Sequence, residues 1–276
     1  MVKVSIQGYQ GSFHDIVARR KFGGDLELIE RSAFFEVFED VKTAVADFGV
    51  VAIENSIGGS ILENFDLLLK YNLKIVAEMY LRIVHNLIVL PGVTMRHVKE
   101  VYTHPIAVMQ CLNFLQAHSE MKIIRTDDTA GSVKMIKERD LINAAAIASK
   151  LAAEIYDMEI LASSIETAKE NYTRFLVISG EARYDEKADK TSMVIQTEHR
   201  PGSLFKSLKC FADEGINLSK IESRPIIGKT WNYYFYLDFE AAYNAPETKR
   251  ALEALGQVTS IVKILGSYER GGIIEM

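Results

Sequence analysis

The residues best suited to chemistry form the stretch Asn-Tyr-Thr-Arg-Phe-Leu-Val-Ile at 171–178. A hydroxyl group (Thr173), a fixed cation (Arg174) and an aromatic ring (Phe175) stand at the start of an apolar run that is typical of a buried strand. A strand entrance that presents these three groups suits a small, anionic, ring-bearing ligand. An ordinary strand edge with one surface charge has the same pattern, so the rest of the chain must decide between the two interpretations.

Four loops elsewhere in the first 180 residues share one polarity, because all are rich in hydroxyl groups, amides and glycines. They are Gly8–His14, Glu54–Ser60, Thr103–Gln110 and Asp127–Gly131. Each lies between a predicted strand end and a helix start, and in an α/β sheet such loops gather where ligands bind. The helices that follow direct N–H groups and positive dipole ends into the same space, which makes an anion site with few cations. One such loop alone could be a plain N-cap; the set favours a cleft for a carboxylated small molecule.

Other kinds of chemistry lack a sequence signal. We find no Ser-His-Asp order, no His/Cys cluster with metal spacing and no glycine-rich nucleotide loop after a strand. His85, His104 and His118 are scattered, and we interpret each as a structural histidine. Glu54 could act as an acid or be solvated. A site of neutral hydroxyl and amide groups suits positioning and charge stabilisation better than covalent catalysis.

The elements that must position these groups alternate between strand and helix, which predicts an α/β fold with largely parallel sheets. The apolar stretch 73–90 is typical of a crossing between two lobes, and a return is expected near 165–179. Residues 1–179 are therefore predicted to form two α/β lobes with a cleft. Strands are predicted at 3–7, 26–30 with an exit at 34–35, 48–53, 73–79, 81–90 and 175–178, and helices at 12–22, 36–46, 61–71, 131–139 and 149–156.

Residues 180–190 are polar, charged and aperiodic, as in a linker. The pattern in 191–276 differs from that of the first part: strand, helix, strand, a long aromatic strand at 231–240, helix and strand. This order is the β-α-β-β-α-β arrangement of a ferredoxin-like domain.

Composition sets outer bounds on function. The 276 residues are 48% hydrophobic and 25% charged, which is typical of a globular protein with a full core. A net charge of −5 argues against a nucleic-acid partner. Cys111 and Cys210 are isolated and are expected to be buried small hydrophobes. Since neither a leader nor an 18-residue apolar run is evident, we expect a cytoplasmic protein without a membrane partner.

Several blocks together resemble a known family, the bacterial monofunctional prephenate dehydratases. The blocks are Gly8-Tyr9-Gln10-Gly11-Ser12-Phe13, Ile53-Glu54-Asn55-Ser56 with Gly59, Thr103-His104-Pro105 with Gln110-Cys111, Asp128-Thr129-Ala130-Gly131 and Asn171-Tyr172-Thr173-Arg174-Phe175. In the second domain, Pro201-Gly202-Ser203-Leu204 and Ile221-Glu222-Ser223-Arg224-Pro225 are similar to two blocks of its ACT regulatory domain. The ordered set covers nearly the whole chain.

The resemblance implies a periplasmic-binding-protein-like catalytic region followed by an ACT domain. It implies conversion of prephenate to phenylpyruvate, water and CO2 in phenylalanine synthesis, without a cofactor or metal, and feedback inhibition by phenylalanine. ACT domains commonly pair, so a homodimer or homotetramer is expected. The effector is expected at a subunit interface, around residues Gly202, Ser203, Leu204, Asn217, Leu218, Glu222, Ser223 and Arg224.

By position, the resemblance places the catalytic threonine at Thr173 and supporting polar groups at Asn55, Thr103 and Gln110. We predict that Thr173 polarises or relays a proton to the departing hydroxyl, since free threonine is a poor acid. Predicted substrate contacts are Ser56, Thr129, Arg174, as a carboxylate clamp or a structural ion pair, and Phe175, as a ring contact or core packing.

Departures from the family pattern bear on specificity. Threonine stands at 103 where serine is usual, Tyr9 where proline is common, His14 where a small hydroxyl residue is common, and Ser203 in place of alanine. Four alternatives remain open at this point: an arogenate dehydratase, a lyase for another small cyclic diacid, a non-catalytic amino-acid-responsive binding protein, and a purely structural ferredoxin-like dimerisation module at the C-terminal end.

Overall fold

The computed structural model describes residues 1–183 and 185–275. Its backbone packs into two units. Unit 1 comprises Met1–Ile61, Met79–Phe175 and the C-terminal residues from Ile273; unit 2 comprises Leu62–Glu78 and Leu176–Gly272. The segment 62–78 thus packs with the C-terminal half of the chain. Strands β5 (Lys74–Arg82) and β11 (Tyr172–Ser179) continue from one unit into the other.

The first sheet has the strand order β16-β5-β11-β3-β1-β2, and β4 pairs with β3. Its core strand β1 pairs in parallel with β2 and β3, in the register Val4↔Leu28 and Val4↔Phe48. The apolar runs of β1 and β3 are buried, as expected for strands of a parallel sheet. The remaining elements here are β1 (Val2–Gln7), α1 (Phe13–Phe22), β2 (Leu26–Arg31), α2 (Phe34–Lys42), β3 (Phe48–Asn55), β4 (Gly59–Ser60) and β16 (Ile273–Ile274).

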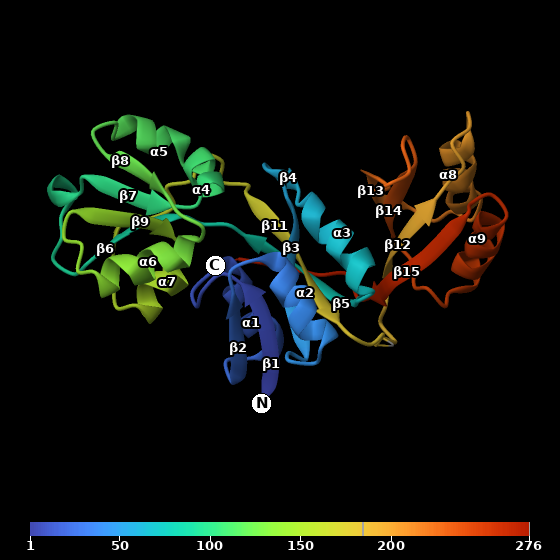
Figure 1. The fold of residues 1–276 in the computed structure, drawn as a ribbon, viewed down its shortest axis with the longest axis horizontal. Helices are drawn as coiled ribbons and strands as arrows, with labels where there is room; N and C mark the ends of the chain where they lie inside the picture. The colour runs from blue at the N-terminus through green and yellow to red at the C-terminus, as the bar shows by residue number, and fades with distance from the viewer. Residues whose placement is uncertain (184, 276) are drawn as a thin grey trace. The chain divides into compact units, whose positions relative to one another are not determined.

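The second sheet of unit 1 has the order β10-β6-β9-β7-β8. Its central strand β9 (Ala144–Ala148) is buried throughout. Figure 1 shows why: α4 and α5 lie on one side of this sheet, and α6 and α7 on the other. The other elements are β6 (Asn86–Val89), a 3-10 helix (Met95–His97), β7 (Glu100–Thr103), α4 (Pro105–Gln110), α5 (Leu112–Ala117), β8 (Lys122–Arg125), α6 (Thr129–Glu138), α7 (Lys150–Ile155) and β10 (Glu159–Ala162).

Two chain crossings join the sheets of unit 1. The chain leaves the first sheet after β5 and enters the second at β6, then returns between β10 and β11. These are the crossings predicted within 73–90 and 165–179. The mixed α/β fold with two α/β lobes is therefore confirmed.

Two local predictions were wrong. Residues 34–35 are not the exit of a strand but the start of α2, because Glu36 accepts hydrogen bonds from the backbone N–H groups of Ser32 (3.0 Å) and Ala33 (2.9 Å) and so caps a helix there. The predicted strand 81–90 is broken: β5 runs on to Arg82 and β6 begins at Asn86. The break places His85 outside both strands.

Unit 2 contains the predicted β-α-β-β-α-β arrangement, with sheet order β13-β14-β12-β15. Helices α8 and α9 cover one face, where Met193, Leu237 and Phe239 pack with Phe211 and Leu255. The elements are α3 (Leu62–Tyr71), β12 (Lys190–Gln196), α8 (Ser203–Asp213), β13 (Leu218–Pro225), β14 (Tyr233–Phe239), α9 (Pro246–Gly256) and β15 (Ile261–Tyr268).

The same sheet also contacts α3 and β5 within unit 2. The Tyr236 hydroxyl donates to the Phe65 carbonyl over 2.8 Å, and Arg224 forms an ion pair with Asp66 on α3. Lys190, at the start of β12, lies 2.9 Å from both carboxylate oxygens of Glu78, and both side chains are buried. Removing one partner of such a buried ion pair leaves an unpaired buried charge, which destabilises the folded state.

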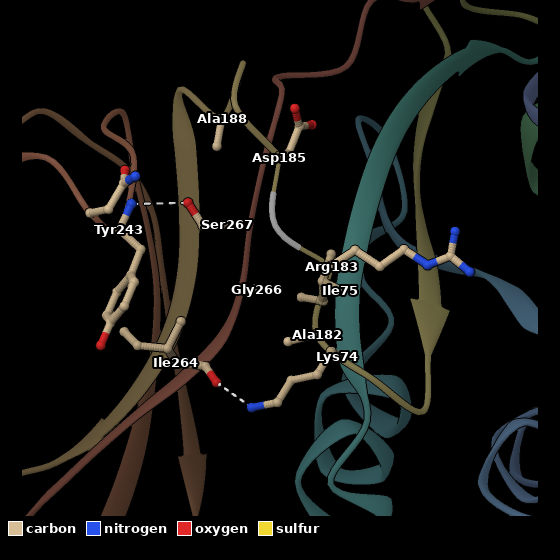
Figure 2. Close-up of a pocket in the computed structure, with 11 residues that line it drawn as sticks. Lys74, Ile75, Ala182, Arg183, Asp185, Ala188, Tyr243, Ile264, Gly266 and Ser267 are labelled. Carbon is tan, nitrogen blue, oxygen red and sulfur yellow. Dashed lines mark hydrogen bonds between the residues drawn. The ribbon is translucent and has the colours of Figure 1, made fainter.

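A cavity of about 390 Å³ lies along this contact (Figure 2). Lys74 Nζ donates to the Ile264 carbonyl over 3.0 Å, and Ser267 Oγ accepts from the Tyr243 N–H over 3.0 Å. The Arg183 guanidinium points away from the cavity in Figure 2. A Cβ atom at Gly266 would lie 2.0 Å from the Ile75 carbonyl oxygen, so only glycine allows β15 to approach β5 this closely.

The two cysteines differ. Cys111 is buried, as predicted, whereas Cys210 is half-exposed because it lies on α8 and donates to the Lys206 carbonyl over 3.3 Å. In the described part of the chain, no helix is both long and apolar enough to cross a membrane.

Candidate functional site

A cavity of about 430 Å³ in unit 1 collects the ends of strands and the starts of helices from both sheets. It is lined by residues of the four predicted loops and of β11. The lining residues are Gln7, Ser12, Phe13, His14, Phe34, Ala52, Asn55, Gly58, Ser60, Ile61, Ile83, His85, His104, Ile106, Ala107, Gln110, Asp127, Asp128, Thr129, Thr173 and Phe175. None of these described lining residues is a lysine or an arginine, so an anion would be held by neutral donors.

Close packing between the lobes shapes this cavity. Gly11 has φ +84°, and a Cβ atom there would lie 2.6 Å from Ala152 Cα. The Ser149 hydroxyl donates to the Gly11 carbonyl at the same place. Ser12 then caps α1 by accepting from the Asp15 N–H over 3.3 Å. Three residues at the start of α1, namely Ser12, Phe13 and His14, line the cavity.

Asn55, at the end of β3, has its amide fixed in one orientation. Its Oδ1 accepts from two backbone N–H groups, those of Ile57 (3.0 Å) and Gly58 (2.7 Å). Its Nδ2 must therefore be the donor, and it lies 2.9 Å from Thr173 Oγ1 and 2.8 Å from Asn171 Oδ1. The turn that follows β3 thus decides which group Asn55 presents to β11.

This orientation leaves the Thr173 hydroxyl with a hydrogen to donate. Its oxygen accepts from Asn55, and the side chain is 8% exposed at the cavity. A hydroxyl is one donor and two acceptor lone pairs, so accepting from an amide orients the hydroxyl and does not use its proton. Thr173 can therefore donate to an oxygen bound in the cavity.

Gln110, at the end of α4, is held from the opposite lobe. Its Oε1 lies 2.7 Å from His85 Nε2, and both side chains are buried. Burial lowers the pKa of His85, against smaller opposite effects of Gln110 and Glu166. A neutral imidazole and an amide thus make a polar wall without net charge.

His14 and Phe175 form an apolar wall. Their rings meet edge to face with centroids 5.1 Å apart. His14 Nε2 accepts from the Ala52 N–H over 3.2 Å, and burial lowers the pKa of His14 to about 3, so the ring is neutral at physiological pH. A bound ring could pack here without meeting a charge.

Asp128 closes the end of the cavity at α6. Its Oδ1 accepts from the Gly131 N–H over 2.6 Å as the N-cap of that helix. Burial raises the pKa of Asp128, which the backbone hydrogen bonds oppose. His104, the N-cap of α4, accepts from Ile106 N–H over 3.2 Å through Nδ1, and burial lowers its pKa. An acid therefore occupies the start of α6, whereas the acid in the first turn of α1, Asp15, accepts from the Gly11 N–H over 2.8 Å and lies outside the cavity lining.

The cavity brings together five of the residues singled out from the sequence, namely Asn55, Gln110, Thr129, Thr173 and Phe175. Three other described residues lie outside its lining. The Thr103 hydroxyl is fully buried and donates to the Ile147 carbonyl over 2.8 Å. Ser56 Oγ accepts from the Tyr172 N–H over 2.9 Å and so joins β3 to β11.

Arg174 is the third residue outside the lining. Successive side chains of a strand point to opposite faces, so when Thr173 and Phe175 face the cavity, Arg174 faces away. It is 5% exposed. Its role as a carboxylate clamp stays a prediction, and this placement favours the structural alternative.

Sequence reasoning placed the loops that contain His14 and Asp128 at the cleft without giving either residue a role, and it interpreted His85 as structural; all three line the cavity. His85 and Gln110 are 25 positions apart in the sequence, so no local spacing of residues predicts their contact. Among residues 1–183 and 185–275, no group of three His, Cys, Asp or Glu side chains is placed to hold a metal ion.

A family model described as prephenate dehydratase matches residues 4–183. The chain is also 39% identical over 280 residues to arogenate dehydratase/prephenate dehydratase 2 of Arabidopsis thaliana, covering 97% of this chain and 72% of the relative. This chain belongs to the prephenate dehydratase family.

Two solved structures agree in fold with this member of the family. Prephenate dehydratase from Arthrobacter aurescens in complex with L-Phe has a TM-score of 0.88 at 30% identity, covering 98% of this chain and 90% of that one. A structure named GqqA, a quorum-quenching acylase, has a TM-score of 0.88 at 29% identity, covering 97% and 98%.

Proposed function

We propose that this chain catalyses the decarboxylative dehydration of prephenate to phenylpyruvate. The bond from the ring to its carboxylate breaks, and CO2 leaves. The electron pair of that bond enters the ring, makes it aromatic and expels the hydroxyl on the opposite side. This hydroxyl takes one proton and leaves as water. Since aromatisation drives the reaction, the enzyme has to orient the substrate and stabilise the departing oxygen.

The observation that carries the proposal is the Asn55–Thr173 hydrogen bond of 2.9 Å. Asn55 donates to Thr173, and the hydroxyl hydrogen of Thr173 is therefore directed to the departing oxygen. Threonine is a poor acid, so its hydroxyl polarises the leaving group or relays a proton that solvent replaces. Gln110 supplies a second donor.

The test is turnover of prephenate by the purified chain, measured as phenylpyruvate formation. Thr173→Ser keeps the hydroxyl and should keep most of the activity; its control is Thr173→Val, which has nearly the same shape without the hydroxyl. Equal turnover by the two variants would refute the role of Thr173.

The substrate could instead be arogenate, because several named relatives are arogenate dehydratases. The two substrates differ in a keto or an amino group beside one carboxylate. Comparing kcat/KM for both on the same preparation decides between them. An acylase with Thr173 as nucleophile is disfavoured, since a nucleophilic hydroxyl needs a base and its partner here, the Asn55 amide group, is a donor.

We further propose that the C-terminal β-α-β-β-α-β module (191–276) is an ACT regulatory domain that binds phenylalanine, and that 1–179 and 180–190 are the catalytic domain and the linker. The complex of the Arthrobacter protein with L-Phe supports this proposal. In one chain, Ser203 lines a cavity of about 310 Å³ at the start of α8. The described lining of this cavity includes none of the predicted residues on β13. A site shared between two copies would bring both segments to the effector.

The pairing of β13 with β14 places the predicted effector residues of β13 on opposite faces of the sheet. Ser223 pairs with Phe235, on the face that α8 covers, whereas Glu222 pairs with Tyr236 on the opposite face. Arg224 shares the face of Glu222 and contacts Asp66. We propose that Gly202, Ser203, Leu204 and Ser223 contact phenylalanine and that Arg224 transmits its binding.

Titration calorimetry with phenylalanine on the wild type and on Ser203→Asp tests this assignment. The added carboxylate should repel that of the effector and weaken binding, whereas Lys249→Gln on α9, which also lowers the net charge by one, serves as a charge control. Light scattering with and without phenylalanine tests the homodimer or homotetramer. The cytoplasmic location stays a prediction.

A further inference from the structure

The side chain of His85 hydrogen-bonds to another residue of the cavity lining, Gln110. The contact from His85 Nε2 to Gln110 Oε1 is 2.7 Å, and the two side chains are 1% and 8% exposed. The ring also meets Phe13 edge to face, with centroids 5.4 Å apart. A ring packed in this way has little freedom to leave its partner.

The donor in this hydrogen bond can be assigned from its surroundings. His85 Nδ1 is buried and has no partner among the described residues. If the amide of Gln110 were turned round, Nε2 would have to accept, and the ring proton would sit on Nδ1 as a buried N–H without an acceptor. Unpaired buried N–H groups are rarer than unpaired acceptors. The proton is therefore on Nε2, Gln110 Oε1 accepts it, and the Gln110 amide N–H groups remain for the cavity.

The backbones of His85 and Gln110 are both held by the segment 165–167. Ile165 N–H donates to the His85 carbonyl over 2.9 Å, and Glu166 accepts from the His85 N–H over 3.0 Å. Thr167 N–H donates to the Gln110 carbonyl over 2.7 Å. The segment 165–167 thus sets the distance between the two backbones. Such preorganisation is what a transition-state donor requires.

We propose that His85 is a positioning residue that orients the Gln110 amide as a donor to a substrate oxygen. This inference rests on the proposed function for its kinetic consequence, but not for its structural claim. Gln110 would then present N–H groups only to an oxygen acceptor, such as a carboxylate of the substrate or its departing hydroxyl. In this role His85 acts through Gln110 and exchanges no proton with the substrate.

The kinetic test uses His85→Phe, which keeps a ring without a donor, and His85→Gln, which restores an N–H at similar reach. His85→Phe should lower kcat/KM by about 10- to 100-fold, the range for one hydrogen bond to a charged group. His85→Gln should recover most of it. In a Gln110→Ala background, His85→Phe should cost nothing further. The proposal would be overturned if the fold-loss in kcat/KM of the double variant Gln110→Ala/His85→Phe equalled the product of the two single losses. A His85→Phe enzyme as active as wild type would overturn it as well.

A second measurement stands apart from turnover. Nitrogen NMR of histidine-labelled protein, with the His85 signals assigned by their loss in His85→Phe, should show the proton on Nε2, and proton placement on Nδ1 would overturn the proposal. His118→Phe, which removes a half-buried ring bonded to the Phe114 carbonyl outside the cavity, is the matched control for activity and for melting temperature. If the proton is on Nε2 but the protein turns over neither prephenate nor arogenate, the proposed function is rejected and the structural claim about His85 stands.

Discussion

At the scale of single residues, Asn55 decides what the Thr173 hydroxyl can do. Asn55→Asp should keep the turn after β3, because a carboxylate can still accept from the N–H groups of Ile57 and Gly58. It cannot donate to Thr173, so the hydroxyl would turn its hydrogen to the carboxylate. We expect kcat to fall by about 100- to 1,000-fold, the usual loss for one transition-state donor. The melting temperature should also fall, because the new carboxylate would face Asn171 Oδ1 and the Tyr172 carbonyl, which accept from Asn55 Nδ2 over 2.8 and 3.2 Å. Steady-state kinetics checks this, and full activity would contradict it.

His14 should make stability depend on pH. Its pKa is lowered from 6.5 to about 3 by burial, so the unfolded chain binds a proton between these values and the folded chain does not. The contribution of the neutral ring is complete above pH 6.5 and is lost as the pH falls, by about 1.4 kcal/mol per pH unit. Urea unfolding from pH 7 to pH 5 should show a shallower loss for His14→Gln than for wild type. Identical slopes would contradict a buried neutral His14.

Which residues of the site were predictable follows from their connections. Thr173, Asn55 and Gln110 lie within recognisable blocks, and the cavity contains all three. Arg174 and Thr103 lie in the same blocks yet outside the lining, because strand alternation and a hydrogen bond to Ile147 turn them elsewhere. Contacts that join distant segments, such as those of His85, have no periodic trace in the sequence.

At the scale of elements, helix caps and strand periodicity predicted most of what the structure contains. The two errors, at 34–35 and within 81–90, arose where local propensity was overridden. Phe34 and Phe35 favour strands by type, but a capping carboxylate two positions later starts a helix. In the second case an apolar run continues through a chain crossing.

The contact between α3 and β13 should couple effector binding to the cavity, because α3 begins directly after Ile61, which lines it. Arg224→Met removes the ion pair with Asp66 and keeps most of the side-chain length. We expect phenylalanine to bind as before and to inhibit less. Asp66→Asn should act in the same direction, and the double variant should be no worse than either one. Calorimetry measures binding, and kinetics measures inhibition; unchanged inhibition in both variants would contradict the coupling.

At the scale of the whole molecule, the sequence predicted the two lobes and the C-terminal β-α-β-β-α-β module. It did not predict that 62–78 packs with 176–272, because that contact joins an amphipathic helix to a sheet more than a hundred residues away. The sequence shows that each element has an apolar face, but only the structure shows against which other element that face packs.

The Lys190–Glu78 pair should affect the stability of unit 2 mainly when one of its two partners is removed. Both side chains are buried, at 4% and 0% exposure, and their atoms lie 2.9 Å apart. Lys190→Met leaves a buried carboxylate and should lower the free energy of unfolding by about 3–5 kcal/mol. Adding Glu78→Leu removes that carboxylate and should restore much of the loss. Urea unfolding checks both variants, and a single variant as stable as the double one would contradict this prediction.

The most direct measurement is the rate of phenylpyruvate formation from prephenate by Thr173→Val and Thr173→Ser beside the wild type. Removing a positioned proton donor typically costs about 100- to 10,000-fold, so we expect a loss in that range in kcat for Thr173→Val, with KM changed little and Thr173→Ser close to wild type. A Thr173→Val enzyme with wild-type kcat would show that the hydroxyl held by Asn55 does not assist the departing oxygen.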